Sequence, residues 1–82
     1  MEGKELIMKI YGYEMNGEEL LELEETSIDC TLEELEKLIE FFSYVKKKHY
    51  GKKSNSMCHT HLRDWDTTWK ESTPDLIIVS NN

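Results

Sequence analysis

The sequence has no apolar run near the roughly 18 to 20 residues that a membrane-spanning helix needs, and residues 1–15 lack the apolar core of a secretory signal. We therefore expect a cytoplasmic protein with no membrane partner. The chain has only two cysteines, Cys30 and Cys58. Because disulfides rarely persist in the cytoplasm, we expect both to be reduced thiols that act as small, partly buried apolar side chains.

The sequence also lacks a glycine-rich phosphate loop. Cys58 and His59 are adjacent in the chain, but adjacent side chains of a strand point to opposite faces, so the thiol has no base within reach. Asp64 and Asp66 are too short a carboxylate pattern to indicate acid–base catalysis. We therefore expect a non-enzymatic protein that uses no cofactor.

Charge is distributed unevenly. The 82 residues carry 17 acidic and 10 basic side chains, for a net charge of −7. Residues 1–45 hold 13 of the acids and 3 of the bases, whereas residues 46–82 hold 4 acids and 7 bases. An acidic chain is repelled by phosphate backbones and attracted to basic partners, so direct binding of nucleic acid is not expected.

A long helix is predicted to follow Thr31 and to end near Tyr50. Thr31 and Glu34 have the spacing of a capping box, and Gly51 suits the left-handed position after the last turn. The basic residues of that turn offset the helix dipole, which explains the lysine run without a ligand; they are Lys46, Lys47, Lys48 and His49. Apolar residues at helical spacing predict one stripe facing the core: Leu32, Leu35, Leu38, Ile39, Phe42 and Val45.

Four strands are predicted around this helix. Residues 5–13 and 19–29 flank Asn16-Gly17, a strong signal for a tight hairpin turn, and residues 57–63 and 75–80 follow the helix. With no repeat or linker, we expect a single α+β domain over residues 1–82. Its fold would be a two-layer ββαββ arrangement, with one helix packed on a four-stranded, mostly antiparallel sheet.

The last strand, which follows Pro74, is apolar on both alternating faces, so we expect it to be central in the sheet and covered on both sides. One helix covers only one face of four strands. The second face would be exposed, paired with a partner, or covered by the loop that carries the two tryptophans.

The stretch MCHTHLRDWDTTW, residues 57–69, is the densest cluster of chemically active side chains. In a strand, Cys58, Thr60 and Leu62 share one face, and Met57, His59, His61 and Arg63 share the other. Since Cys58 and Leu62 suit a helix-covered core, we expect His59, His61 and Arg63 to project from the open face.

Three interpretations of this cluster stay open. Tryptophan and arginine are frequent interface anchors, so the cluster predicts a recognition surface made of His59, His61, Arg63, Trp65 and Trp69, unless the tryptophans fold back as a minor core. A small zinc-binding domain is a second interpretation, because His59 and His61 can converge on one ion, but a third ligand such as Asp64 or Asp66 is needed. A homodimer formed through the open face or an edge strand is the third.

The chain resembles a family of small bacterial immunity proteins from polymorphic toxin systems, immunity protein family 32, over residues 20–80. The resemblance is carried by an LLELEE strand, an EELEKLIEFF helix, an H-x-H-L-x-D motif, a tryptophan and a closing PDLIIV strand. The residues of the motif and the tryptophan are His59, His61, Leu62, Asp64 and Trp69.

This resemblance implies a protein that binds and neutralises a cognate toxin. His59, His61, Asp64 and Trp69 would then be motif positions that contact the toxin or hold the fold. Toxins that cut nucleic acid are basic, and an acidic inhibitor is steered toward such a surface. The predicted steering surface spans residues 14–40 and is centred on Glu18, Glu19, Glu22, Glu24 and Glu25.

Overall fold

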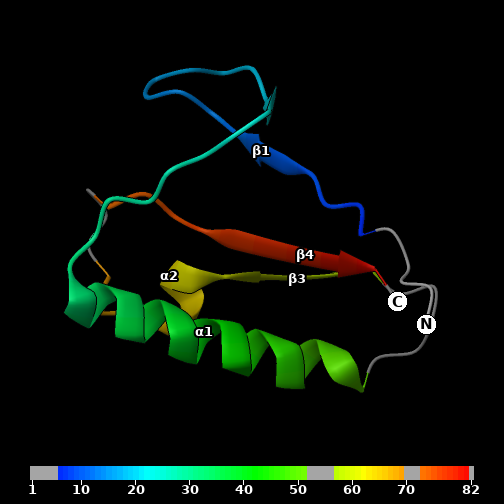
Figure 1. Ribbon diagram of the computed structural model, residues 1–82, viewed down its shortest axis with the longest axis vertical. Coiled ribbons are helices and arrows are strands. Elements are labelled where there is room, and N and C mark those ends of the chain that lie inside the picture. The colour runs from blue at the N-terminus through cyan, green and yellow to red at the C-terminus, as the bar shows by residue number, and fades with distance from the viewer. Residues whose placement is uncertain (1–5, 52–56, 70–72, 82) are drawn as a thin grey trace.

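The computed structural model describes residues 6–51, 57–69 and 73–81. Its elements follow the order β1 (Ile10–Gly12), β2 (Leu21–Leu23), α1 (Leu32–Tyr50), β3 (Met57–His61), α2 (Leu62–Trp65) and β4 (Ile77–Asn81). In Figure 1, α1 lies along one side of the β3–β4 pair and the β1–β2 hairpin lies on the other side. The protein is therefore α+β, as predicted.

The predicted four-stranded sheet is wrong. Within the described ranges, β1 pairs only with β2 and β3 pairs only with β4, which makes two separate antiparallel sheets. The strands of the first sheet have three residues each, far fewer than the ranges 5–13 and 19–29 predicted. Strands this short offer too few backbone groups to extend a second sheet.

The hairpin turn explains why β1 and β2 are short. Ile10 pairs with Leu23, which is the register that a turn centred on Asn16 and Gly17 sets, but the pairing stops at Gly12 and Leu21. Instead, the N–H of Gly17 donates to the carbonyl oxygen of Glu14 over 2.8 Å, and Asn16 has a φ of 61°. Continued pairing would place Glu14 opposite Glu19, and like charges in that arrangement destabilise a sheet.

The start of α1 is as predicted. The hydroxyl of Thr31 accepts a hydrogen bond from the N–H of Glu34 over 3.1 Å, and the N–H of Thr31 donates to the Glu34 carboxylate over 2.8 Å. The end differs, because Gly51 has a φ of −82° and its N–H donates to the His49 carbonyl oxygen. The left-handed ending predicted for Gly51 is therefore wrong.

The core contains a narrower face of α1 than the sequence predicted. Leu38, Phe41 and Val45 are buried together with Leu62 of α2. Phe41, which was not in the predicted stripe, is 0% exposed. The remaining members of that stripe, namely Leu32, Leu35, Ile39 and Phe42, are exposed. With a single small sheet to cover, α1 needs only the residues that directly face it.

His49 completes the buried face of α1 one turn after Val45. Its Nε2 lies 2.8 Å from the Thr60 hydroxyl on β3, and its Nδ1 lies 2.6 Å from the Ser80 hydroxyl on β4. Sequence reasoning assigned His49 to compensation of the helix dipole, whereas the structure shows a buried polar link between α1 and both strands.

Substitution of Phe41 by alanine is expected to destabilise the protein by about 3 to 5 kcal/mol, because it opens a cavity in the only buried cluster of the described chain. Phe42 is the matched control, since its side chain is 45% exposed. Phe42→Ala should cost less than about 1 kcal/mol. Urea unfolding followed by circular dichroism measures both, and similar losses in the two variants would contradict the burial pattern.

Candidate functional site

The histidines of β3 lie on its outer face, as predicted. Thr60 and Leu62 are buried on the side of α1, whereas His59 is exposed and the His61 side chain is 36% exposed. His59 pairs with Val79 and His61 pairs with Ile77, and side chains of paired residues project to the same face.

The outer face is apolar as well as polar. Ile77 is 47% exposed and Val79 is 52% exposed, so β4 is covered on one face only. The expectation that β4 is a central strand buried on both sides is therefore wrong. Because the predicted four-stranded sheet does not form, no strand of the described chain pairs with the second edge of β4.

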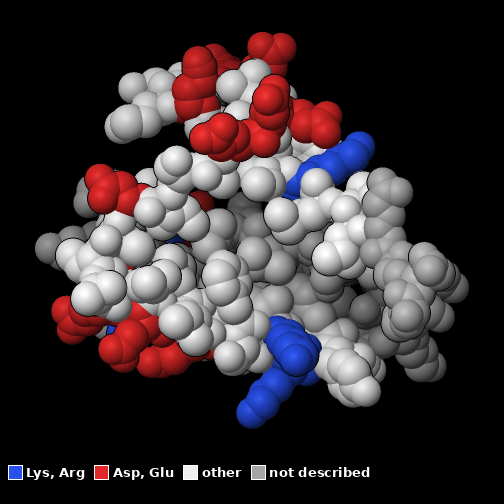
Figure 2. All heavy atoms as spheres, viewed as in Figure 1, with Lys and Arg blue, Asp and Glu red and all other residues white. Residues whose placement is uncertain are grey.

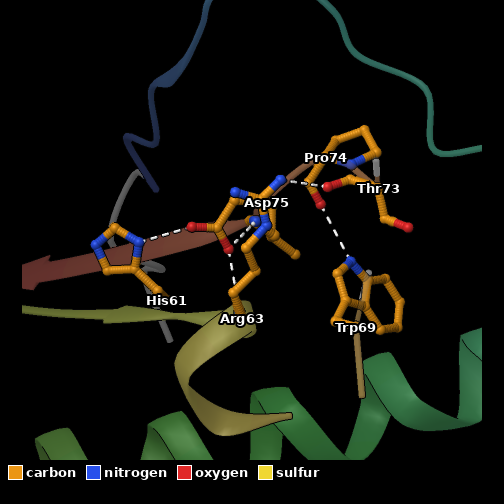
Figure 3. Close-up of polar contacts among 7 residues, drawn as sticks. His61, Arg63, Trp69, Thr73, Pro74 and Asp75 are labelled. Atoms are coloured by element: carbon orange, nitrogen blue, oxygen red, sulfur yellow. Dashed lines mark hydrogen bonds and ion pairs between the residues drawn. The ribbon is translucent and has the colours of Figure 1, made fainter. Parts of the chain in front are cut away.

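Asp75 holds His61 in position (Figure 3). The carboxylate oxygen Oδ2 lies 2.7 Å from Nδ1 of His61, and Oδ1 accepts hydrogen bonds from the N–H groups of Arg63 over 3.1 Å and Leu76 over 2.9 Å. An ionised carboxylate only accepts hydrogen bonds, so Nδ1 of His61 carries the hydrogen. In neutral His61 the lone pair is then on Nε2.

Partial burial opposes the ionisation of Asp75, but hydrogen bonds from His61, Arg63 and Leu76 outweigh it and hold the pKa of this carboxyl below its ordinary value. Sequence reasoning missed Asp75. Asp75 lies 14 residues from His61, and no spacing rule joins the two. Its position just before an apolar strand was the only available signal.

Arg63 does not project freely from the open face. The strand ends at His61, and Arg63 belongs to the helical turn α2. The guanidinium donates from Nη2 to the carbonyl oxygen of Thr73 over 2.5 Å, so Arg63 ties α2 to the segment that precedes β4. The predicted strand over residues 57–63 was two residues too long. Because Arg63 lies in α2 instead of the strand, its side chain does not follow the strand alternation.

The two tryptophans pack against the main core instead of capping the outer face of the sheet. The ring of Trp65 lies 5.5 Å from the ring of Phe41 and 6.1 Å from that of Tyr44. The indole N–H of Trp69 donates to the carbonyl oxygen of Pro74 over 3.1 Å. Both side chains are half-buried, so each stabilises the fold and leaves part of its surface accessible.

Asp64 is exposed and lies beside the histidines. Together with residues of α1, β3 and α2 it lines an open pocket of about 220 Å³, whose other lining residues are Tyr44, Lys48, His59, Thr60, His61 and Trp65. Asp66 serves the loop instead, since its Oδ1 accepts hydrogen bonds from the backbone N–H and the hydroxyl of Thr68. Of the predicted motif residues, His59, His61 and Asp64 come together at this pocket, whereas Leu62 and Trp69 do not line it.

The predicted acidic residues form a different surface. Glu18, Glu22, Glu24 and Glu25 are exposed, and Figure 2 shows acidic side chains gathered over the β1–β2 hairpin at the top of the view. In Figure 1, β4 lies between this hairpin and β3. The structure therefore does not bring the glutamates together with His59 and His61.

Both cysteines are free thiols. Cys58 is half-buried, as expected, but Cys30 is exposed, because it lies in the extended segment before α1 rather than under a sheet. No group of three or more histidine, cysteine or acidic side chains within the described ranges is arranged to hold a metal ion. No helix in that same part of the chain is long and apolar enough to span a membrane.

No protein-family model, curated protein or solved structure matches this chain. The resemblance to immunity protein family 32 therefore rests on its motif residues and the order of its elements. In the structure, His59, His61 and Asp64 of that motif line one pocket, and Leu62 is buried in the core with Leu38, Phe41 and Val45.

The lowered pKa of Asp75 predicts a pH-dependent contribution to stability. This contribution is present above the unfolded pKa of about 3.9 and is lost as the pH falls through the folded pKa. Asp75→Asn should cost about 1 to 3 kcal/mol at pH 7, because hydrogen bonds to a charged group are lost. Urea unfolding between pH 2 and 7 should show the difference from the native protein shrinking below pH 4.

Asp64→Asn is the matched control for this measurement, because the side chain of Asp64 is exposed, whereas that of Asp75 is partly buried. We expect its free energy of unfolding to stay within about 0.5 kcal/mol of the native value at pH 7. A loss in Asp75→Asn that is independent of pH would contradict the role of the ionised carboxylate.

Proposed function

We propose that this protein is a non-enzymatic immunity protein that binds a basic bacterial toxin and blocks it. The observation that carries the proposal is the amount of surface that the chain leaves exposed. Its accessible surface is 7809 Å² for a mass of 9.7 kDa. A compact monomer of this mass exposes about 5,100 Å².

The difference is about 2,700 Å², which exceeds the roughly 800 Å² that each partner buries in a standard protein–protein interface. Its radius of gyration, 14.4 Å, is also larger than the roughly 11.7 Å expected for 82 residues. A chain this open gains stability when a partner covers its exposed apolar side chains.

The hairpin region has the composition of a partner-binding surface. Between residues 6 and 28, the chain carries large exposed apolar side chains and, from Glu14 onward, exposed glutamates as well. The exposed apolar ones are Leu6, Ile7, Met8, Tyr11, Tyr13, Met15, Leu20, Leu21 and Ile28. Apolar side chains supply contact area, and the glutamates steer a basic partner and speed the encounter. This combination is the physical basis for placing the toxin contact on the hairpin.

The outer face of β3–β4 supplies a second contact region within the same proposal. His59, His61 and Asp64 are accessible there beside Ile77 and Val79. Three half-buried side chains anchor the neighbouring segments. Trp65 and Trp69 pack against the core, Trp69 also donates to Pro74, and Arg63 donates to Thr73 in the segment before β4. Their expected role is to hold the contact surface in shape.

We expect the protein to co-purify with the product of the gene immediately upstream and to bind it faster at low salt. Glu24→Lys combined with Glu25→Lys should lower the association rate constant about tenfold or more at low ionic strength, because it reverses charge at the steering surface. Stopped-flow or biolayer measurements from 20 to 500 mM salt would record both effects.

The matched control reverses two charges on α1 instead, with Glu36→Lys and Glu40→Lys, which belong to the predicted steering range of residues 14–40 but lie outside the hairpin. Both double variants have the same net charge, so a difference between them reports the position of the charges. Glu22 is unchanged in both variants, because its carboxylate lies 3.9 Å from the Lys9 ammonium. An equal decrease of the association rate constant in the two variants, or a rate constant that does not change with salt, would contradict the steering role of the hairpin.

A second candidate function is self-association through β4. This strand pairs with β3 alone in the described chain and carries no charged residue between Ile77 and Asn81. Natural edge strands are commonly protected by charged side chains or proline, and an unprotected edge pairs readily with another strand. An antiparallel pair of two β4 strands centred on Val79 would join two sheets into one of four strands.

For this candidate, sedimentation velocity is expected to show a dimer at micromolar concentration. Val79→Lys should return the protein to a monomer, because it places like charges next to each other at the centre of the pair. Ile39→Lys is the control, since Ile39 is an exposed apolar residue on α1. A native monomer at 100 μM would eliminate this candidate and leave the toxin proposal untouched.

A further inference from the structure

We propose that His59 and His61 form a surface chelating site for a divalent transition-metal ion, with Asp75 holding His61 in the coordinating orientation. The site does not depend on the proposed toxin contact. It differs from a structural zinc domain, because it uses two protein ligands and leaves the other coordination positions to water.

The first argument is the separation of the two rings. His59 and His61 are two residues apart on one face of β3, and their ring centroids lie 5.7 Å apart with the planes at 74°. Two imidazoles that bind one ion through nitrogens at about 2.0 to 2.1 Å have centroids about 5 Å apart in tetrahedral geometry. The observed separation is within about 1 Å of that value, so the spacing of the two rings is compatible with one shared ion.

The second argument is the hydrogen bond from His61 to Asp75. Histidine ligands of metal ions almost always donate their other ring N–H to a carboxylate, carbonyl or water, which fixes the tautomer and raises the basicity of the coordinating nitrogen. Nδ1 of His61 lies 2.7 Å from Oδ2 of Asp75, and two backbone N–H groups hold that carboxylate in place. Nε2 of His61 is therefore the coordinating atom.

The third argument is the space beside the rings. Both histidines line the open pocket of about 220 Å³, which has room for an ion with its remaining water ligands. The carboxylate of Asp64 at its rim favours a cation. The ammonium of Lys48 opposes one, but it lies 5.7 Å from the centre of the Tyr44 ring, whose face attracts it.

The ligand set selects the metal. Imidazole nitrogens suit zinc, copper and nickel, whereas magnesium and calcium require oxygen ligands. Cys58 does not take part, since the alternation of β3 directs it to the opposite side from His59 and His61. His49 is buried and its two ring nitrogens contact Thr60 and Ser80. The chain's remaining histidines are the two of the proposed site.

Isothermal titration of the full chain, prepared without a histidine tag, tests the site with nickel, zinc and magnesium chloride in a non-chelating buffer. We expect one nickel or zinc ion per chain, no binding of magnesium, and loss of saturable binding when His59 and His61 are both replaced by alanine. Asp75→Asn should weaken binding about 10- to 100-fold, as is usual for the carboxylate partner of a histidine ligand.

Asp66→Asn is the matched control, because Asp66 is also hydrogen-bonded but contacts Thr68 rather than a histidine. Its affinity for nickel should equal that of the native chain. In case Asp75→Asn is too unstable to titrate, proton NMR of the native chain with substoichiometric nickel supplies an independent readout. The ring signals of His59 and His61 should broaden first, and those of His49 should persist.

Three results would overturn the proposal. They are the absence of saturable nickel and zinc binding, unchanged affinity in the double alanine variant, and broadening that begins at another part of the chain. Unchanged affinity in Asp75→Asn would contradict the orienting role given to Asp75.

Discussion

Packing of α1 against one face of the β3–β4 pair is the constraint on which the rest of this structure depends. Phe41, Leu38 and Val45 exclude water together with Leu62, and His49 links the helix to hydroxyl groups on both strands. Burial of an imidazole requires hydrogen-bond partners, and Thr60 and Ser80 supply them. Once this face of β3 is buried, strand geometry directs His59 and His61 outward.

The same constraint leaves the chain with much unburied apolar surface. A single helix on two strands encloses a small core, and the β1–β2 hairpin does not join the β3–β4 sheet. The hairpin region combines exposed apolar residues with glutamates, whereas the outer face of β3–β4 combines Ile77 and Val79 with imidazoles. The two surfaces suit different chemistry: the first suits a basic macromolecule, and the second suits a flat apolar contact or a metal ion.

Local patterns were predicted well. The capping box of Thr31 and Glu34 and the length of α1 depend on residues within a few positions, so they can be read from the sequence. The alternation of Thr60 against His59 and His61 follows from the pleat of a strand, whereas Leu62 is buried as the first residue of α2. The prediction of the buried face of α1 was less accurate. Apolar residues at helical spacing occur on two adjacent faces of this helix, and the sequence does not say how wide the sheet beneath it is.

Contacts between distant segments could not be predicted. Asp75 lies 14 residues from His61, and His49 lies 31 residues from Ser80, so neither contact leaves a signal in local spacing. Whether the hairpin pairs with the β3–β4 sheet also depends on contacts between segments far apart in the chain. Local patterns do not determine such contacts, so the prediction of a four-stranded sheet was wrong.

By itself, the sequence determined the start and length of α1, the hairpin turn at Asn16-Gly17 and the side of β3 that suits a core, because backbone geometry and local hydrogen bonds set these features. Only the tertiary structure decided what each polar side chain contacts, since that depends on loops that bring distant residues together. Asp75 became the partner of His61, and Arg63 the link to Thr73, through the return of the chain from α2 into β4.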